Sequence, residues 1–554
     1  MTLAPRLLVS FLAGLRVARL KRRLRSAGDG LAGQRRAFRH LTGQLAGTAF
    51  GREHRLEAGL DYARFRAAVP LRTIEQFQPY VARMMAGEAG VLWPGDCRLY
   101  VETAGTTTGT PQRLPVTGEQ LEHYRAGLTA TVLMLAARTG HTGLFLGRHL
   151  HAGGSVDLVE AGRNHTGSLE AFTHFALSPW TEANLYAPPA PVAVLPEGAA
   201  RTEQTVERML RRDVTVLVGN PAALHALAEA VRRKASAPKR VVHHLTAVWP
   251  NLEGVIHTGA APGLLGPELR AMAGPSVLQH ELYAAAEGYF AAQESDASAG
   301  LRLLTELGVF FEFLPWAGFS EGGLAVAGSR CVGLDQVRPG VDYVLVVTTP
   351  AGLCRAVTGD IVRFLETEPP RLQFVGRTRH RLEAFDEQIG ERELTDALLE
   401  VCAAQGWSPV CFHVAPLAHR LAPPARGGHE WWIELRSGTV RTPTGPLLAE
   451  ELDAALARRN ADYAARRADQ RLAPPVVRLV MPGTFERWRA DHWPGCSPAK
   501  LPRCRSDRAI ADGLMGLARF HAGTEPVPLA ASVAGTRHPF AGRPAPGGSR
   551  PPLP

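Results

Sequence analysis

The sequence is poor in lysine and has no framework of cysteines. Only four lysines occur among its 554 residues: Lys21, Lys234, Lys239 and Lys500. A mechanism that needs a catalytic ammonium group therefore has very few candidates. The seven cysteines are scattered and form no C-x-x-C pair, which excludes a disulfide scaffold and argues against a zinc site. We therefore expect a reducing compartment, the cytoplasm.

Long apolar runs are also missing. No uncharged apolar stretch reaches about 18 residues, so the sequence predicts no transmembrane helix. Residues 7–15 are apolar, and most of the nearby positive charge follows them, whereas a signal peptide carries its charge in front. The pattern predicts a first amphipathic helix on a globular domain. A helix that lies on a membrane surface is the alternative.

Common catalytic and nucleotide-binding motifs are absent. There is no G-x-x-x-x-G-K-[ST] loop, no G-x-S-x-G elbow, and no second histidine that would complete a zincin motif after His429. Gly28, Gly30 and Gly33 match the spacing G-x-G-x-x-G, but they follow an arginine-rich helical stretch instead of a strand. We interpret this as a chance match.

The composition is that of a folded protein with a basic surface. Apolar residues make up 45% and charged residues 21% of the chain, and the formal net charge is +10. This charge suits anionic partners such as nucleotides, nucleic acid or an acidic membrane, without choosing among them. The arginines are spread along the chain and no RRM, KH or helix-turn-helix signature occurs, so we expect no nucleic-acid partner.

Hydrophobic periodicity predicts alternating strands and helices. Residues 1–85 are mostly helical in pattern, with breaks at 28–30 and near Pro70. Further along, the pattern predicts strands at 99–102, 214–218, 341–349 and 431–435, and helices at 119–138, 222–233 and 446–468. Such alternation indicates an α/β fold. Residues 526–554 are rich in Pro, Gly and Arg, which predicts a disordered tail.

One local motif contains groups that can bind phosphate without a lysine side chain. After a strand-like segment, residues 103–109 read TAGTTTG, so two glycines bracket three threonines. Glycine lets the backbone approach phosphate oxygens closely. Consecutive N–H groups and hydroxyls can then cradle an anion. The motif predicts a phosphate-binding loop, and an ordinary flexible turn is the alternative.

Three signatures in this order resemble the auxin-responsive acyl-acid amido synthetase (Gretchen Hagen) family of the adenylate-forming superfamily. The loop at 103–113 is similar to [ST]-S-G-T-[ST]-x-G-x-x-K, residues 283–287 are similar to Y-x-x-x-E, and residues 352–360 are similar to G-L-[YW]-R-Y-x-x-G-D. The resemblance spans about residues 30–510. Shorter flanking matches lie at residues 48–51, 65–70, 87–94, 249–253, 311–315, 374–377 and 500–504.

The resemblance implies a fold and an activity. The fold is a large N-terminal α/β domain of adenylate-forming type, over residues 1–372, with a smaller α+β C-terminal domain over 373–525 and the nucleotide between them. The activity is that of an ATP-dependent acid–amino acid ligase. ATP, with Mg²⁺, activates a carboxylic acid as an acyl-adenylate, and the amine of an amino acid then attacks the acyl carbon to give an amide and AMP.

The resemblance also implies roles for individual residues. The phosphate cradle would consist of Thr103, Gly105, Thr106, Thr107 and Gly109. The residues around the rest of the nucleotide would be Tyr283 against the adenine, Asp360 on the ribose hydroxyls, Arg377 on ribose or phosphate, Glu287 on Mg²⁺, and Lys500 arriving from the C-terminal domain. Each also has an ordinary structural interpretation, such as a turn threonine, a core tyrosine, a turn aspartate or a surface glutamate on a helix.

Several positions depart from the family pattern. The loop lysine is Gln112, with Arg113 beside it, and the serine of the loop is Ala104. The third signature has Cys354 and Ala356 where aromatic residues are usual, and Gln388 replaces a further lysine. We expect Arg113 to supply the missing charge in catalysis. The alternatives are an adenylate-forming enzyme with another acceptor, such as a thiol, and a degenerate homologue that binds nucleotide without catalysis.

Overall fold

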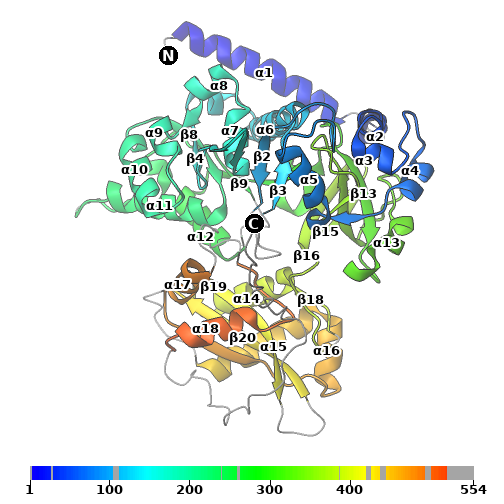
Figure 1. Cartoon of the computed structure of the whole chain (residues 1–554). Coiled ribbons are helices and arrows are strands. Elements are labelled where there is room, and N and C mark those ends of the chain that lie inside the picture. The colour runs from blue at the N-terminus through cyan, green and yellow to red at the C-terminus, as the bar shows by residue number, and fades with distance from the viewer. Residues whose placement is uncertain are drawn as a thin grey trace, which may run out of the picture.

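The computed structural model of the chain describes residues 3–25, 29–103, 112–238, 240–258, 263–385, 387–419, 426–436, 444–492 and 501–520. A larger N-terminal half surrounds one extended sheet, and a smaller C-terminal half surrounds a three-stranded sheet (Figure 1). The α/β prediction is confirmed. None of the helices within these ranges is long and apolar enough to cross a membrane.

The described part of the first 85 residues is mostly helical, as predicted. The helices are α1 (Leu3–Arg25), α2 (Asp29–Ala46), α3 (Ala49–Glu53), α4 (Tyr62–Ala68) and α5 (Gln78–Met85). The break after Pro70 is the short strand β1 (Arg72–Thr73), which pairs with β15. Gly30 and Gly33 lie inside α2, where a Cβ on Gly33 would come within 2.8 Å of the Thr305 carbonyl oxygen. These glycines therefore serve helix packing, in line with a chance motif match.

The large sheet combines antiparallel and parallel parts. In spatial order its strands are β13 (Phe310–Pro315), β14 (Asp342–Thr348), β15 (Ala356–Thr367), β16 (Pro370–Arg377), β12 (Leu301–Leu303), β11 (Gly288–Gln293), β10 (Leu278–Ala285), β9 (Gly254–Thr258), β8 (Val214–Gly219), β4 (Arg148–Ala152) and β7 (Tyr186–Ala187). From β10 to β7 neighbouring strands run parallel, and from β13 to β10 they run antiparallel. The predicted strands at 214–218 and 341–349 are confirmed as β8 and β14.

Helices surround this sheet on the parallel side. They include α6 (Gly118–Thr139), α7 (Leu169–Phe175), α8 (Pro179–Asn184), α9 (Ala190–Ala193), α10 (Ala199–Met209), α11 (Pro221–Ala235) and α12 (Gly266–Ala273), with α13 (Leu324–Ala327) near β13. A second, four-stranded sheet has the order β3 (Arg113–Pro115), β2 (Leu99–Glu102), β6 (Asn164–Gly167) and β5 (Val159–Ala161). The predicted helices at 119–138 and 222–233 and the strand at 99–102 are confirmed as α6, α11 and β2.

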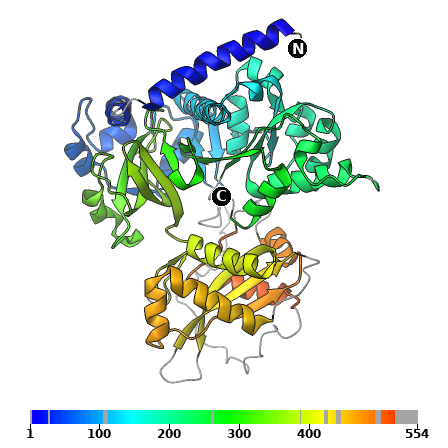
Figure 2. The ribbon, with the colours of Figure 1, turned by 180° about the vertical axis from the view of Figure 1, so that it is seen from behind.

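The C-terminal half has a mixed sheet with helices on both faces. Its elements are β17 (Arg381–Leu382), β18 (Ile389–Gly390), α14 (Glu391–Gln405), β19 (Pro409–His419), β20 (Arg426–Leu435), α15 (Gly445–Arg459), α16 (Ala461–Ala468), β21 (Val476–Val480), α17 (Thr484–His492) and α18 (Ala509–Leu517). Helix α18 faces the viewer in Figure 1, whereas α14 to α16 face the viewer in Figure 2. Two separate apolar clusters correspond to these two faces.

The predicted single helix at 446–468 is wrong in one respect, because the structure has two helices there. Asn460 separates α15 from α16, and its side-chain oxygen accepts the N–H of Tyr463 at 2.8 Å. Its amide nitrogen donates to the Gln388 carbonyl and to Glu393, both at 2.9 Å. An asparagine used in this way favours a helix start over a helix interior.

The predicted domain boundaries stay predictions. The large sheet itself continues to Arg377, at the end of β16, five residues beyond the predicted boundary at 372. Residues 521–554, which include the predicted tail, lie outside the described residues.

Helix α6 is fixed to the sheet by a buried histidine. The Nδ1–H of His123 donates to the Leu307 carbonyl at 2.7 Å, and its Nε2 accepts the backbone N–H of Tyr289 at 2.8 Å. The second bond requires an unprotonated Nε2, so the imidazole is neutral. Burial lowers the pKa of His123 to about 4.

This geometry predicts acid sensitivity. The pKa of His123 is lower in the folded chain than the ordinary value of 6.5, so its stabilising contribution is complete above pH 6.5 and is lost as the pH falls toward 4. The full loss is about 3 kcal/mol of unfolding free energy. We expect His123→Gln to be less stable near neutral pH but to lose less stability on acidification, as measured by urea unfolding. His243→Gln, at an exposed position, is the matched control, and equal acid sensitivity of both variants would contradict the assignment.

Candidate functional site

A large cleft lies between the two halves of the described structure. Its volume is about 1760 Å³, and residues of both halves line it. The lining includes Tyr283, Glu287 and Asp360 from the N-terminal half and Arg392, Phe412 and Arg503 from the C-terminal half. A concave site in which polar groups from separate segments converge is the expected place for a substrate.

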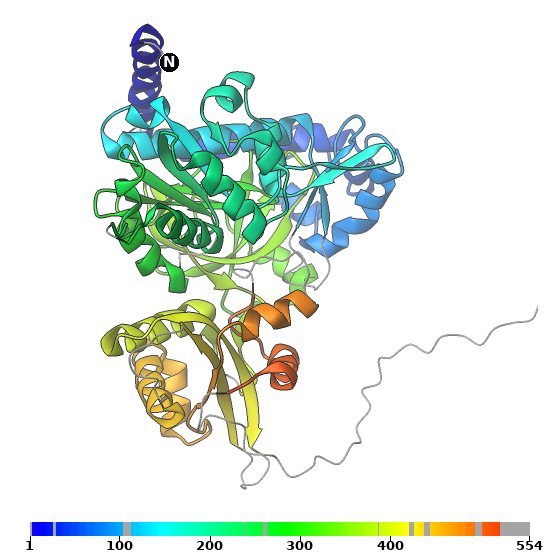
Figure 3. The ribbon, with the colours of Figure 1, turned by 90° about the vertical axis from the view of Figure 1, so that its left-hand side faces the viewer.

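One arginine joins the two halves across this boundary. Arg436, which follows β20, pairs with Glu229 of α11 at 2.8 Å and with Glu268 of α12 at 2.5 Å. The same guanidinium lies 3.2 Å from Nε2 of His225. These contacts help to hold the C-terminal half in the orientation that Figure 3 shows.

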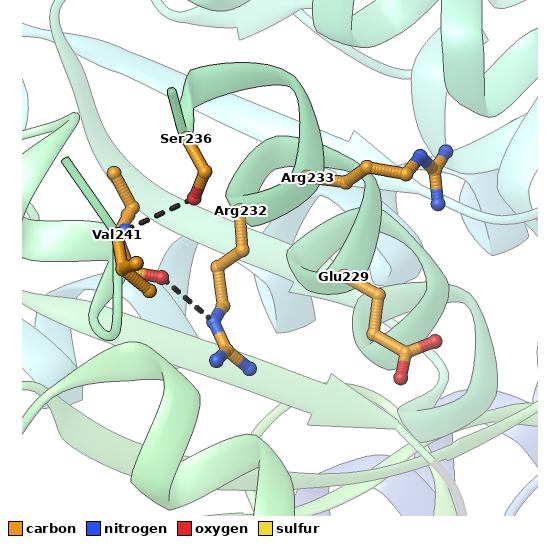
Figure 4. Close-up of a pocket in the computed structure, with 6 residues that line it drawn as sticks. Glu229, Arg232, Arg233, Ser236 and Val241 are labelled. Carbon is orange, nitrogen blue, oxygen red and sulfur yellow. Dashed lines mark hydrogen bonds between the residues drawn. The ribbon is translucent and has the colours of Figure 1, made fainter. Parts of the chain in front are cut away.

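A second hollow, of about 390 Å³, lies at the C-terminal end of α11 (Figure 4). Its polar groups already bind one another: the Ser236 hydroxyl accepts the Val242 N–H at 3.0 Å, and Arg232 Nε donates to the Val242 carbonyl at 3.1 Å. None of the predicted site residues lines it. We therefore take the interdomain cleft as the candidate site.

Tyr283, Asp360 and Arg377 come together in this cleft. The Tyr283 hydroxyl on β10 donates to Asp360 Oδ2 on β15 at 2.7 Å, and Arg377 Nε on β16 lies 3.3 Å from Asp360 Oδ1. Gly359 directly before Asp360 has φ of 80°, and the β15–β16 pairing shifts register just after it. A left-handed residue is readily supplied by glycine. This explains the glycine of the Gly359–Asp360 signature.

The protonation states of this cluster follow from burial. Tyr283 and Asp360 are both 6% exposed. Burial raises the pKa of Asp360, and the positive charge of Arg377 opposes that shift. Burial and the neighbouring Asp360 raise the pKa of Tyr283 well above its usual value, so the phenol keeps its proton. Each oxygen of Asp360 accepts one bond in the cluster and has a second lone pair for a ligand.

Glu287 reaches the same cleft from the turn between β10 and β11. Residues 278–285 are a strand, paired with β9 on one side and β11 on the other. The alternative interpretation of Glu287 as a surface glutamate on a helix is therefore wrong, since pairing on both sides fixes an extended backbone before the turn and Glu287 is buried. Strand β10 ends directly before this turn, so Tyr283 on the strand and Glu287 in the turn both line the cleft.

Helix α6 holds this turn by three side chains. Gln120 Nε2 donates to the Glu287 carbonyl at 3.1 Å, the Tyr124 hydroxyl donates to the Ala286 carbonyl at 2.5 Å, and His123 binds Tyr289 as described above. Sequence reasoning missed these residues. Their spacing on a helix was visible, but the turn that they contact lies about 160 residues further along the chain.

Glu287 is a buried acid whose burial the positive charge of Arg377 offsets only in part, so that its pKa stays raised. The residue is 8% exposed, and no basic side chain in the described ranges forms an ion pair with it. Burial raises its pKa to about 7, and neighbouring Asp360 adds to the shift. A hard cation prefers such an oxygen ligand, and Mg²⁺ usually takes only one or two protein carboxylates together with water and phosphate. The part of the chain that the structure describes contains no cluster of three or more His, Cys, Asp or Glu that could hold a metal ion.

The two ends of the predicted phosphate loop are fixed at the cleft. The Thr103 N–H donates to the Gln112 carbonyl at 2.8 Å, and the Gln112 N–H donates to Thr103 Oγ1 at 3.0 Å. Both residues line the cleft. The remaining predicted loop residues, Gly105, Thr106, Thr107 and Gly109, lie outside the described residues.

Arg113 is the predicted residue that the structure does not bring to the cleft. Its Nε donates to Glu102 at 3.0 Å, its side chain is 45% exposed, and it does not line the cleft. Successive residues of a strand point to opposite faces, so Gln112 faces the cleft and Arg113 faces away. The local twist that would bring Arg113 inward is not present. Lys500 lies outside the described residues, and Leu501 after it lines the cleft.

A second group of charged residues lines the cleft near the start of the C-terminal half. Glu391 at the start of α14 lies 3.2 Å from Nδ1 of His380 and accepts the backbone N–H of Arg503 at 2.8 Å. These favourable contacts outweigh burial and lower the pKa of Glu391 to about 2. Within this group, only Glu391 could be noticed in the sequence, because it belongs to the family-like stretch around Gln388.

Comparison with known proteins decides the family. Three models of one family match successive parts of the chain: the GH3 family N-terminal domain matches residues 21–155, the GH3 family central domain matches 302–377, and the GH3 family C-terminal domain matches 392–509. Together they match more than half of the chain. The chain belongs to the GH3 family. The resemblance inferred from the three signatures is thereby confirmed.

Individual relatives agree with this assignment. A rice (Oryza sativa subsp. indica) indole-3-acetic acid-amido synthetase, GH3.8, is 25% identical over 548 residues, covering 85% of this chain and 87% of the relative. The solved structure of GH3.15 acyl acid amido synthetase superimposes with a TM-score of 0.68 at 17% identity, covering 89% of this chain and 96% of that one. A 2-hydroxyisobutyryl-CoA ligase in the postadenylation state gives a TM-score of 0.56 at 14% identity, covering 88% and 92%. The adenylate-forming fold predicted for this GH3 protein is confirmed.

The cluster around Asp360 generates a prediction for nucleotide binding. Asp360→Asn keeps the shape of the side chain but removes the charge that the ribose hydroxyls would meet. Hydrogen bonds to a charged group contribute about 1.5–3 kcal/mol, so we expect ATP affinity to fall roughly tenfold or more. Isothermal titration calorimetry measures it, with Asp335→Asn at an exposed position as control. Unchanged affinity in a folded variant would show that Asp360 only orders Tyr283 and Arg377.

Proposed function

We propose that this GH3 protein is an ATP-dependent acyl-acid amido synthetase. It would activate a carboxylic acid as an acyl-adenylate, with release of pyrophosphate, and transfer the acyl group to the amine of an amino acid. The observation that carries this proposal is the meeting of Tyr283, Asp360, Arg377 and Glu287 in one interdomain cleft. Tyr283 and Glu287 belong to the second family signature, Asp360 to the third, and Arg377 to the flanking match at 374–377.

The chemistry explains why such a cleft is needed. A carboxylate is a poor electrophile, and adenylation turns one of its oxygens into part of a good leaving group. The attack of the acid on the α-phosphate gathers negative charge, which fixed donors and cations must stabilise. Mg²⁺, when bound, would supply part of that stabilisation. In the second step the amine attacks the acyl carbon, the bond to the phosphate oxygen breaks, and AMP leaves.

Each residue of the cleft takes one task in this proposal. Tyr283 would lie against the adenine, with its ring held by the 2.7 Å bond to Asp360. Asp360 would accept the ribose hydroxyls, and Arg377 would bind ribose or phosphate. Glu287 would hold the metal. The Thr103–Gln112 loop would surround the phosphates.

The positive charge lost with the loop lysine needs another source. Arginines of both halves line the cleft, among them Arg377, Arg392, Arg489 and Arg503. We propose that these side chains, with Lys500, replace the missing charge. Arginine binds phosphate in a forked geometry and can do so from a longer reach than lysine.

One part of the cleft lining, in the N-terminal half, indicates which kind of carboxylic acid the cleft binds. His151, Tyr186 and Arg201 line it, on β4, β7 and α10. Arg201 is buried and donates to the Ala193 and Leu195 carbonyls at 2.9 and 2.8 Å, and no carboxylate in the described ranges forms an ion pair with it. We propose that the acid carries a polar group at the end away from its reacting carboxylate, because a purely apolar tail would leave these groups unmatched.

The deciding experiment is ATP–pyrophosphate exchange with a panel of acids. We expect exchange that depends on added acid, with hydroxylated or dicarboxylic acids preferred over unsubstituted aliphatic ones, and amide plus AMP when amino acids are added. Glu287→Gln should lose exchange while remaining folded. Absence of exchange with every acid would favour a non-catalytic homologue. Thioester formation with coenzyme A, without amide, would favour another acceptor.

A pair of variants tests the replacement of the loop lysine. Gln112 faces the cleft, so Gln112→Lys should raise the exchange rate roughly tenfold by adding a charge beside the phosphates. Arg113→Ala removes only an exposed ion pair with Glu102, so we expect less than about a threefold change. Arg98→Ala, which removes a similar exposed pair with Asp96, is the control. A large loss with Arg113→Ala alone would restore Arg113 as the catalytic cation.

A further inference from the structure

The first helix has an apolar surface that no other described segment of the chain covers. Leu7, Leu8, Phe11, Leu12 and Leu15 of α1 are each between 49% and 64% exposed. Single exposed apolar residues are common, but a contiguous group of five large ones is not. Helix α1 lies across the outer side of the N-terminal half, away from the C-terminal half (Figures 1 and 3).

The opposite face of α1 already has a partner. Ala13 is buried, and Val17, Leu20 and Leu24 pack against the main core. The helix contacts α6 and the short helix η2 (Gly143–Leu146). Because residues three, four and seven apart share one face of a helix, Leu7, Phe11 and Leu15 form a separate stripe that points outward. The exposed side chains are therefore not needed to attach α1 to the protein.

Basic residues continue the same outward face. Helix α1 contains seven arginines and lysines and no acidic residue. Arg16 and Arg19 are exposed and follow the apolar stripe directly. Further toward the body, Arg23 pairs with Glu306. The outward face is thus apolar over residues 7–15 and basic from residue 16 onward.

We propose that the outward face of α1 binds the surface of an anionic phospholipid membrane. The apolar stripe would enter the boundary between headgroups and acyl chains, and the arginines would lie among the lipid phosphates, the arrangement expected of an interfacial helix. A basic segment beside a membrane gains affinity from each positive charge. A nucleic acid would use the arginines but would leave the five apolar side chains in water, and a second copy of this helix would bring like charges together.

The site of chemistry is separate from this surface. The residues that line the cleft do not include any residue of α1. The proposal therefore does not depend on the proposed ligase activity, and variants of α1 should leave pyrophosphate exchange unchanged.

Vesicle flotation with the full chain tests the proposal. We expect the protein to float with vesicles that contain phosphatidylglycerol, to float much less with phosphatidylcholine alone, and to be released by salt. The double variant Phe11→Ser with Leu15→Ser should bind at least roughly tenfold more weakly, since it removes two large apolar side chains from the interface. Arg16→Gln with Arg19→Gln should weaken binding to anionic vesicles and reduce its salt dependence.

Matched controls use exposed residues elsewhere on the surface. Val159→Ser with Val241→Ser removes two apolar side chains that are 58% and 64% exposed, and Arg211→Gln with Arg212→Gln removes two exposed charges outside α1. Both should bind vesicles like the unaltered chain. Failure of the unaltered chain to bind anionic vesicles at low salt would overturn the proposal. So would equal binding by all variants, concentration-dependent dimerisation abolished by the Phe11/Leu15 variant, or DNA binding that competes fully with vesicles.

Discussion

The fold of the N-terminal half depends on one fully buried ion pair between Arg355 and Glu312. Both side chains are 0% exposed, and the closest contact is 2.9 Å. The remaining donors of the guanidinium bind the carbonyls of Arg66, Val69 and Gly328 at 2.7 to 3.0 Å. Such a pair is costly to bury unless every donor is satisfied, and here every N–H of the arginine has a partner. Removing either member would leave a buried charge alone, which typically costs about 3–5 kcal/mol.

This ion pair also explains where the family signatures lie in the sequence. The stretch at 65–70 supplies two of the three carbonyls, the stretch at 311–315 supplies Glu312, and the signature at 352–360 supplies Arg355. Gly352 of that signature has φ of 84°, and a Cβ there would come within 2.3 Å of the carbonyl oxygen of Leu92, which belongs to the stretch at 87–94. These segments, which carry the resemblance to the family, pack against one another. From Arg355, β15 then runs directly to Asp360.

The cleft carries its positive charge differently from the family pattern. With glutamine at the loop position and only four lysines in the chain, the cations in the described part of the cleft are arginines from both halves. Their geometry depends on how the halves meet, which the contacts of Arg436 with Glu229 and Glu268 help to fix. In the proposed function, charge that comes from both halves would link nucleotide binding to the orientation of the C-terminal half. In an acyl-acid amido synthetase, the rate of ATP–pyrophosphate exchange would depend both on nucleotide binding and on the orientation of the C-terminal half.

The sequence by itself determined the elements and the family. Periodicity identified β2, β8, α6 and α11, because residues that alternate or repeat every three to four positions report which face is buried. The order of three signatures identified the GH3 family and placed Tyr283, Glu287 and Asp360 on the list of candidates. Only the tertiary structure decided that Tyr283 lies on a strand, that α6 holds the turn of Glu287, and that Arg113 faces away from the cleft. These facts depend on contacts between residues far apart in the chain, or on which side of a strand meets the cleft, and a local pattern does not record either.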